Sequence, residues 1–247
     1  MDITELLRIP DLEGAKRLLC VQPHPDDNEV GAGATIAKLA DKGCEVIFLT
    51  VTDGSKGTAD PSVSAEELMA RRCAEAQAAG ELLGVREQIF LDYVDGETPD
   101  ATVLRGPIME QIRKVKPDFV LTVDPWLPYE AHQDHRHVGL AVAEAVLGAG
   151  NIHYLKDGPE PWAVTALVFH STTKPNTFID VDGYWERKVE AIRAHESQFS
   201  DADWQFLGMY FDYKARAYAE GRDCERAEAF KVLPPITLHM SVDTVDY

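Results

Sequence analysis

The 247-residue sequence has little positive charge: 24 Lys and Arg residues stand against 42 Asp and Glu residues, a formal net charge of −18. Because a phosphate backbone is bound mainly by Lys and Arg side chains, we expect neither nucleic acid nor an anionic membrane surface as a partner. The sequence also lacks the run of about 18 apolar residues that a membrane span needs, and acids occupy its first residues where a signal peptide is basic. These absences predict a soluble protein of the cytoplasm.

Cysteine is scarce as well, since Cys20, Cys44, Cys73 and Cys224 are widely spaced and form no Cys-x-x-Cys pair. Secreted disulfide scaffolds are small and dense in cysteine, so we interpret these thiols as reduced and mostly buried. No linker, low-complexity tract or internal repeat interrupts the sequence, and 45% hydrophobic residues can supply one large core. We therefore expect a single domain over residues 1–247.

Apolar runs of strand length alternate with longer segments of helical periodicity. This pattern predicts an α/β fold of the Rossmann-like kind, a mostly parallel sheet flanked by helices. The expected strands lie at 17–22, 45–51, 88–91, 119–123 and 165–171. The expected helices lie at about 30–43, 64–84, 101–115, 138–147, 184–195 and 204–219. In such a sheet the ligand site lies beyond the carboxyl ends of the strands.

Two clusters of potential metal ligands follow predicted strands: PHPDD at 23–27, and HQDHRH at 132–137. Zinc hydrolases commonly use three protein ligands from His and Asp or Glu and leave the fourth position to water. Two histidines and one aspartate from these loops would meet that requirement. Taken alone, the first cluster could be a turn that caps a helix, and the second a solvated helix start. Their shared position at strand ends favours a functional site.

Two other sites are disfavoured by the sequence. The Gly31-Ala32-Gly33 stretch lacks the third glycine of a dinucleotide-binding fingerprint, and its turn from the first strand is too long. No serine stands in a G-x-S-x-G elbow, and no cysteine lies in a nucleophile motif. Nucleotide binding and covalent catalysis are therefore not expected.

The motifs resemble those of the LmbE/PIG-L-like zinc deacetylases. The matching segments span most of the sequence: PHPDD with Glu29, GATIAKL, TDG at 52–54, RRCAEA with LGV, AHQDHR, and HESQ at 195–198. The segments DPWLPYEAHQDHR, TTKPN and AIRAHESQF are most similar to the N,N'-diacetylchitobiose deacetylase branch, which removes acetyl groups from N-acetylglucosamine units. Gln133 departs from the usual proline of the family, at a position that is not a ligand.

The resemblance implies a Zn²⁺ ion bound by His24, Asp27 and His135. It also implies that Asp26 is the general base, and that His132 and Asp134 are an accessory pair in which the aspartate orients and charges the imidazole. Zinc with Asp26 would activate water, and zinc with His132 would stabilise the tetrahedral oxyanion. The leaving amine could take its proton from either Asp26 or His132.

Candidates for substrate contacts are Arg72, Asp53, Trp126, Tyr129 and His239. Arg72 matches an RxxEA motif of the family and could hold sugar hydroxyls, or it could be an exposed helix arginine paired with Glu75. Asp53 could border the pocket, and the two aromatic rings could stack on a pyranose or simply pack their loop.

The tail residue His239 has two interpretations. It could lie in a plain edge strand with an exposed imidazole. The resemblance implies instead that this histidine reaches the substrate pocket of a neighbouring subunit, in a homo-oligomer such as a trimer or hexamer.

The favoured function is removal of the N-acetyl group from N-acetylglucosamine or short chitooligosaccharides such as diacetylchitobiose, with release of acetate. Alternatives are the same chemistry on another N-acetylglucosaminyl conjugate, such as a low-molecular-weight thiol precursor, a 2-His-1-carboxylate iron enzyme, or a non-catalytic metal- or sugar-binding protein. Asp26 beside Asp27 favours hydrolysis, because an oxygenase needs no base there. A structural zinc would be expected to have a fourth protein ligand, commonly cysteine, and none is evident near either cluster.

Overall fold

The computed structural model describes residues 8–247, within which seven strands form one mixed sheet in the order β3-β2-β1-β4-β5-β7-β6. The strands are β1 (Arg17–Gln22), β2 (Glu45–Thr52), β3 (Glu87–Tyr93), β4 (Phe119–Val123), β5 (Ala166–His170), β6 (Thr177–Asp180) and β7 (Ala227–Leu233). The first five are parallel, whereas β7 runs antiparallel to both β5 and β6. The expected α/β class is confirmed.

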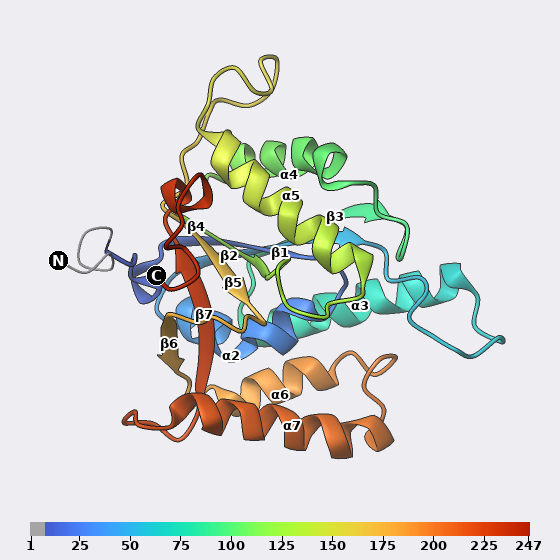
Figure 1. Ribbon diagram of the computed structural model, residues 1–247. Coiled ribbons are helices and arrows are strands. Elements are labelled where there is room, and N and C mark those ends of the chain that lie inside the picture. The colour runs from blue at the N-terminus through green and yellow to red at the C-terminus, as the bar shows by residue number, and fades with distance from the viewer. Residues whose placement is uncertain (1–7) are drawn as a thin grey trace.

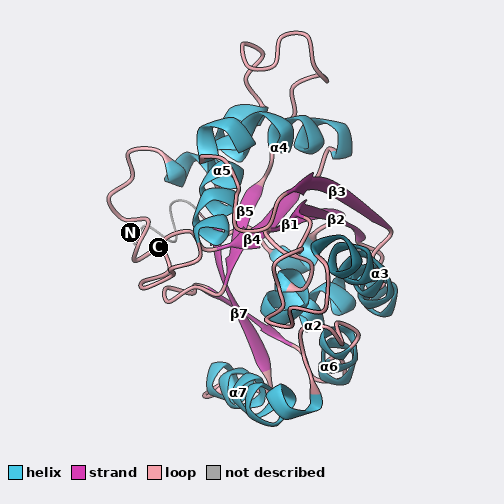
Figure 2. Cartoon of the chain, turned by 90° about the vertical axis from the view of Figure 1, so that its right-hand side faces the viewer, coloured by secondary structure: helices cyan, strands magenta, loops and turns pink. Residues whose placement is uncertain are grey.

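Helices cover both faces of the sheet. They are α2 (Asp27–Asp41), α3 (Ala65–Leu83), α4 (Ala101–Val115), α5 (Gln133–Ala149), α6 (Trp185–Arg193) and α7 (Asp201–Ala219), with short 3₁₀ helices η1 (Leu12–Gly14) and η2 (Pro235–Leu238). Figures 1 and 2 show α4 and α5 on one face, α2, α3 and α6 on the other, and α7 beside β6 and β7. No helix within residues 8–247 is both long and apolar enough to cross a membrane.

Strand β1 shows why the core divides in two. Its residues alternate between the faces of the sheet, so Leu18 and Cys20 join the cluster under α2, while Leu19 and Val21 join the cluster under α4 and α5. A strand that is buried on both faces has an uninterrupted apolar sequence, and the apolar run within 17–22 is the pattern from which β1 was predicted.

The strand order reverses between β1 and β4, since β2 lies on one side of β1 and β4 on the other. Loops that leave the carboxyl ends of these two strands diverge, and this divergence opens a crevice. The two clusters at 23–27 and 132–137 follow β1 and β4, so the topology brings them to that crevice.

Several boundaries differ from the expected ones. Helix α2 begins at Asp27 and α5 at Gln133, so the polar clusters extend into first helical turns instead of lying wholly in loops. Strands β6 and β7 were not expected. The tail forms η2 followed by turns, so the interpretation of that segment as an edge strand is wrong.

Candidate metal centre

The loop after β1 is held in place by contacts at both ends. The carbonyl oxygen of Pro23 accepts from the backbone N–H and the hydroxyl of Thr52, at 2.9 and 2.8 Å. The backbone N–H of His24 donates to Oδ2 of Asp27 at 2.9 Å. Asp26 has φ of 148°, a conformation that L residues rarely adopt and that proteins retain mainly where the surroundings enforce it.

His24, Asp27 and His135 each bring one ligand atom to a common point, and these atoms lie within 4.8 Å of one another. Asp27 is central, because its Oδ2 lies 3.3 Å from Nδ1 of His24 and its Oδ1 lies 3.4 Å from Nε2 of His135. Two imidazoles and a carboxylate from loops more than 100 residues apart thus form a group that could hold a metal ion.

A second group shares His24 and adds Asp95, His132 and Asp134. Nε2 of His24 lies 3.2 Å from Oδ2 of Asp134 and 3.3 Å from Oδ1 of Asp95. The carboxylate of Asp134 also accepts from Gly96 N at 2.7 Å and from the Thr98 hydroxyl at 2.6 Å. Because these contacts occupy its lone pairs, the first group is the better metal-binding set.

The charges of the cluster favour a cation. Burial would lower the pKa of His24, but hydrogen bonds with Asp134, Asp27 and Asp95 raise it to about 12. Burial would raise the pKa of Asp27, but the neighbouring His135 and His24 hold it well below its usual range. Carboxylates that hold a proton on His24 would equally attract a metal ion in its place.

Arg72 is buried, with 3% of its side chain exposed, and its guanidinium donates to Oδ2 of Asp26 at 3.0 Å. It also donates to the carbonyls of Pro25 and Gly54. The interpretation as an exposed arginine paired with Glu75 is wrong, because that partner belongs to the exposed Arg71. Burial raises the pKa of Asp26 to about 6, although the charge of Arg72 acts against this rise.

The pairing of His132 with Asp134 differs from the expected one. Nδ1 of His132 accepts from the backbone N–H of Asp134 at 3.3 Å, whereas the Asp134 carboxylate is 4.0 Å from that nitrogen and contacts His24 more closely. An acceptor at Nδ1 leaves the proton of a neutral imidazole on Nε2. Burial, followed by the charge of His24, lowers the pKa of His132 and favours that neutral form.

Asp53, Trp126 and Tyr129, three other predicted contact residues, lie in loops at the carboxyl edge of the sheet. Oδ1 of Asp53 accepts from the backbone N–H groups of Ser55 and Asp95, so this carboxylate braces two loops. Trp126 is 57% exposed, with its ring edge-to-face against Phe169, and Tyr129 is fully exposed. These two residues share the loop that carries His132.

His239 is not brought to the metal group of its own chain. It is exposed beyond η2 and lines a separate cavity of about 460 Å³ with residues from the carboxyl-terminal half of α5. This cavity lies at the amino-terminal edge of the parallel strands, because α5 runs away from the crevice (Figure 1).

Sequence reasoning missed Asp95 and Glu130. Oε2 of Glu130 lies 3.1 Å from Nδ1 of His135, and its Oε1 accepts from the backbone N–H of His132 at 2.8 Å. Both acids follow strands that end at the crevice, so an inventory of every acid in those loops would have found them. His195 and Glu29, each fully buried, form a further contact of 3.3 Å behind the site.

Residues 19–146 match the family profile described as PIG-L: GlcNAc-PI de-N-acetylase. The diacetylchitobiose deacetylase of Thermococcus kodakarensis is 43% identical over 229 residues, which cover 91% of this chain and 86% of that protein. A 1D-myo-inositol 2-acetamido-2-deoxy-alpha-D-glucopyranoside deacetylase of Kineococcus radiotolerans is 32% identical over 199 residues, covering 68% of this chain and 55% of the relative.

Among solved structures, N,N'-diacetylchitobiose deacetylase from Pyrococcus horikoshii, complexed with its inhibitor MPG, superposes with a TM-score of 0.88. It is 38% identical to this chain, and the match covers 92% of this chain and 87% of that one.

Proposed function

Because the chain belongs to the PIG-L family of de-N-acetylases, we propose that it removes the N-acetyl group from N-acetylglucosamine or short chitooligosaccharides such as diacetylchitobiose, with a zinc ion as cofactor. The observation that carries this proposal is the convergence of His24, Asp27 and His135, with the partly buried Asp26 beside them. The relatives named above supply the substrate class.

The residues fit zinc by their chemistry. Nδ1 of His24 and Nε2 of His135 both face Asp27, and the distal nitrogen of each ring lies within 3.3 Å of a carboxylate, from Asp134 and Glu130 respectively. Zinc-bound histidines usually donate their second ring N–H to such a partner. A catalytic zinc has three protein ligands and an open position. When bound, zinc would supply a Lewis acid that polarises the acetyl carbonyl and lowers the pKa of water.

Asp26 is the general base of this proposal. Its carboxylate is held by Arg72 next to the ligand Asp27, where it can take a proton from the attacking water. The water oxygen bonds to the acetyl carbon, the carbon–nitrogen bond breaks, and acetate and a free amine result. The amine takes this proton from Asp26, because a neutral His132 that gave up its single ring proton would become an imidazolate anion.

His132 donates to the developing oxyanion from Nε2. The backbone N–H of Asp134 holds Nδ1 as an acceptor, so the ring need not reorganise during the reaction. Its side chain is 45% exposed, which leaves Nε2 accessible to a substrate.

Roles at the substrate pocket are proposed for four of the remaining residues. Arg72 and Asp53 shape the floor of the site through Asp26 and Asp95, while Trp126 and Tyr129 offer rings to a pyranose face. His239 lies far from the metal group of its own chain, so it would serve a neighbouring chain in a trimer or hexamer. We place this single-domain enzyme in the cytoplasm.

The test is acetate release from N-acetylglucosamine, diacetylchitobiose and a carboxylate-bearing N-acetylglucosaminyl conjugate, with zinc-loaded and chelator-treated protein. We expect release from the first two, dependent on zinc. Release from the conjugate alone would show that the substrate is such a conjugate and not a chitooligosaccharide. Release that does not depend on zinc would exclude the zinc-dependent mechanism.

A further inference from the structure

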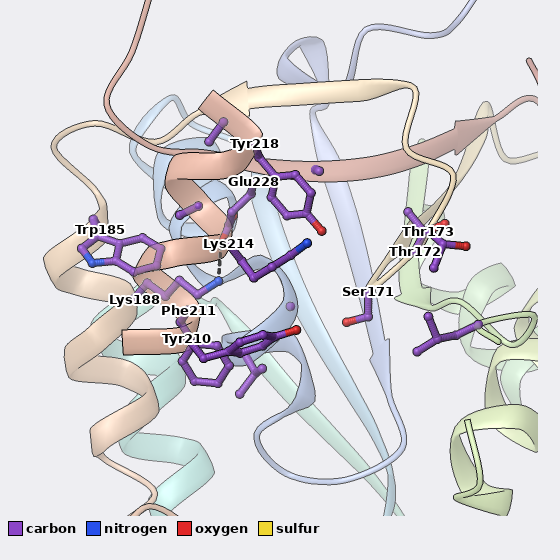
Figure 3. Close-up of a pocket in the computed structure, with 16 residues that line it drawn as sticks. Ser171, Thr172, Thr173, Trp185, Lys188, Tyr210, Phe211, Lys214, Tyr218 and Glu228 are labelled. Atoms are coloured by element: carbon purple, nitrogen blue, oxygen red, sulfur yellow. Dashed lines mark hydrogen bonds and ion pairs between the residues drawn. The ribbon is translucent and has the colours of Figure 1, made fainter. Parts of the chain in front are cut away.

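A cavity of about 380 Å³ lies beside the metal centre at the carboxyl end of β5, within the size range of about 300–1,000 Å³ that ligand pockets occupy (Figure 3). The first turn of α2 contributes Val30 and Gly31, only three and four residues after Asp27. The loop that carries His132 contributes Leu127. A substrate held at the metal centre could therefore extend into this cavity.

One wall of the cavity is formed by the polar ends of three side chains of α7. Tyr210, Lys214 and Tyr218 are spaced four residues apart and so share one face of the helix. Figure 3 shows their hydroxyl and ammonium groups pointing across the cavity toward Ser171 and Thr172. Nζ of Lys214 lies 4.5 Å from the ring centroid of Tyr218 and, within residues 8–247, forms no ion pair.

Lys188, the second lysine that lines the cavity, has a structural role. Lys188 pairs with Glu228 at 2.5 Å, and both side chains are buried. Glu228 also accepts from the backbone N–H of Thr35 at 2.7 Å. These contacts use Lys188 to neutralise a buried carboxylate, which leaves Lys214 as the ammonium that can contact a ligand.

The opposite wall is preorganised. Ser171 has φ of 55°, a conformation that costs a residue other than glycine of order 1–3 kcal/mol and that persists only where the surroundings impose it. Its hydroxyl lies 3.0 Å from Nδ1 of the buried His170. The His170 ring in turn packs on Gly31, where a Cβ would lie 2.0 Å from Nδ1. Ser171 is thus fixed at the rim that joins the cavity to α2.

The chemistry of the lining indicates the class of ligand. The cavity offers five hydroxyl groups, each of which both donates and accepts, and one ammonium; the hydroxyls belong to Ser171, Thr172, Thr173, Tyr210 and Tyr218. A carboxylate could accept from these groups, but it has no donor for the lone pairs of the hydroxyl oxygens and no apolar face for the aromatic rings. A pyranose has hydroxyls of the same dual character and apolar faces suited to aromatic rings.

We propose that this cavity binds the second pyranose of a disaccharide substrate, next to the unit that loses its acetyl group. This assignment rests on the proposed deacetylase function. Lys214 and the tyrosine hydroxyls of α7 contact the sugar from one side, and Ser171 and Thr172 contact it from the other.

The test compares kcat/KM for diacetylchitobiose and for N-acetylglucosamine in Lys214→Met and Tyr218→Phe, with the exposed Lys156→Met as matched control. Loss of a hydrogen bond from a charged group should lower the Lys214→Met value for the disaccharide about ten- to a hundredfold. The value for the monosaccharide should fall much less, and the control should change neither. Equal losses on both sugars, or none, would overturn the assignment, as would a larger loss on the carboxylate-bearing conjugate.

A binding measurement separates this proposal from the proposed function. Calorimetry on zinc-loaded Asp26→Asn protein should show tighter binding of diacetylchitobiose than of N-acetylglucosamine, and adding Lys214→Met should remove the difference. If the wild-type enzyme released no acetate from either sugar, the proposed function would fail, while this titration would still decide the cavity. Equal affinities for the two sugars would rule the second sugar site out.

Discussion

Helix α2 contacts two groups of buried charge that differ in balance. Midway along the helix, Lys188 and Glu228 neutralise each other, and Glu228 also accepts from backbone N–H groups of α2. At its first turn, four aspartates lie close to three histidines and to the guanidinium of Arg72; the aspartates are Asp26, Asp27, Asp95 and Asp134, and the histidines are His24, His132 and His135.

The difference separates a structural role from a functional one. A buried ion pair whose members satisfy each other needs nothing further, whereas a buried surplus of carboxylates is costly unless a cation joins it. The pair near the middle of α2 therefore belongs to the core, and the cluster at its start could hold a positive ion.

The largest expected effect follows removal of a proposed ligand. His24→Ala or His135→Ala should reduce bound zinc to a small fraction of one ion per chain and abolish deacetylation, because two protein ligands cannot retain it. Elemental analysis of purified protein measures this, with the exposed His153→Ala as control. Full metal content in either variant would refute the ligand assignment.

Removal of the base should separate chemistry from binding. Asp26→Asn keeps the ligands and should keep zinc, while the rate of acetate release falls by about 10²–10⁴. Metal content and kcat are measured on the same preparation, beside Asp60→Asn from an exposed loop. Wild-type turnover at equal zinc occupancy would exclude Asp26 as the base.

Breaking the buried ion pair of Lys188 with Glu228 should lower the stability of the fold. Lys188→Met leaves Glu228 buried without its cation, which should lower the free energy of unfolding by about 3–5 kcal/mol. Adding Glu228→Gln should restore part of that loss, and zinc content should remain at the wild-type level in the folded protein. Urea denaturation measures the free energy of unfolding. A loss below about 1 kcal/mol in Lys188→Met would contradict the structural role assigned to this pair.

The smallest expected effect is a loss of zinc affinity when Glu130, which positions the ring of His135, is replaced. Glu130→Gln removes the charge that faces Nδ1 of His135 but keeps an oxygen for the backbone N–H of His132. Zinc affinity, measured by competition with a chelator, should fall about 10- to 100-fold. Glu97→Gln, an exposed residue paired with Lys56, is the control. Unchanged affinity in Glu130→Gln would show that His135 does not depend on this partner.

The parallel half of the fold was predictable and strand β7 was not, for a physical reason. The apolar run of β1 is typical of a strand that is buried on both faces. The sequence of β7, AEAFKVL, has a glutamate and a lysine within the strand and lacks such a run. Its Glu228 and Lys231 are buried, because Lys188 neutralises the first and carbonyl oxygens of the tail, including that of Val245, accept from the second. Partners this distant in sequence leave no local signal.

The position of the metal group was predictable because strand ends meet at one edge of a parallel sheet, and the clusters at 23–27 and 132–137 follow such ends. The choice of His24, Asp27 and His135 within those clusters came from the family resemblance. The contacts of Glu130 and Asp95 were not predictable, since they depend on how two loops fold. The loop with Asp95 turns at Gly96, whose φ of 72° lets its N–H reach Asp134. Sequence spacing does not encode such a path.

Anomalous diffraction from crystals of the zinc-loaded protein, collected at the zinc absorption edge, tests the central claim most directly. The account predicts one peak about 2.0–2.2 Å from Nδ1 of His24, Nε2 of His135 and an oxygen of Asp27, with Asp26 outside the ligand set. A peak held instead by Asp95, His132 and Asp134, or none at this crevice, would contradict it.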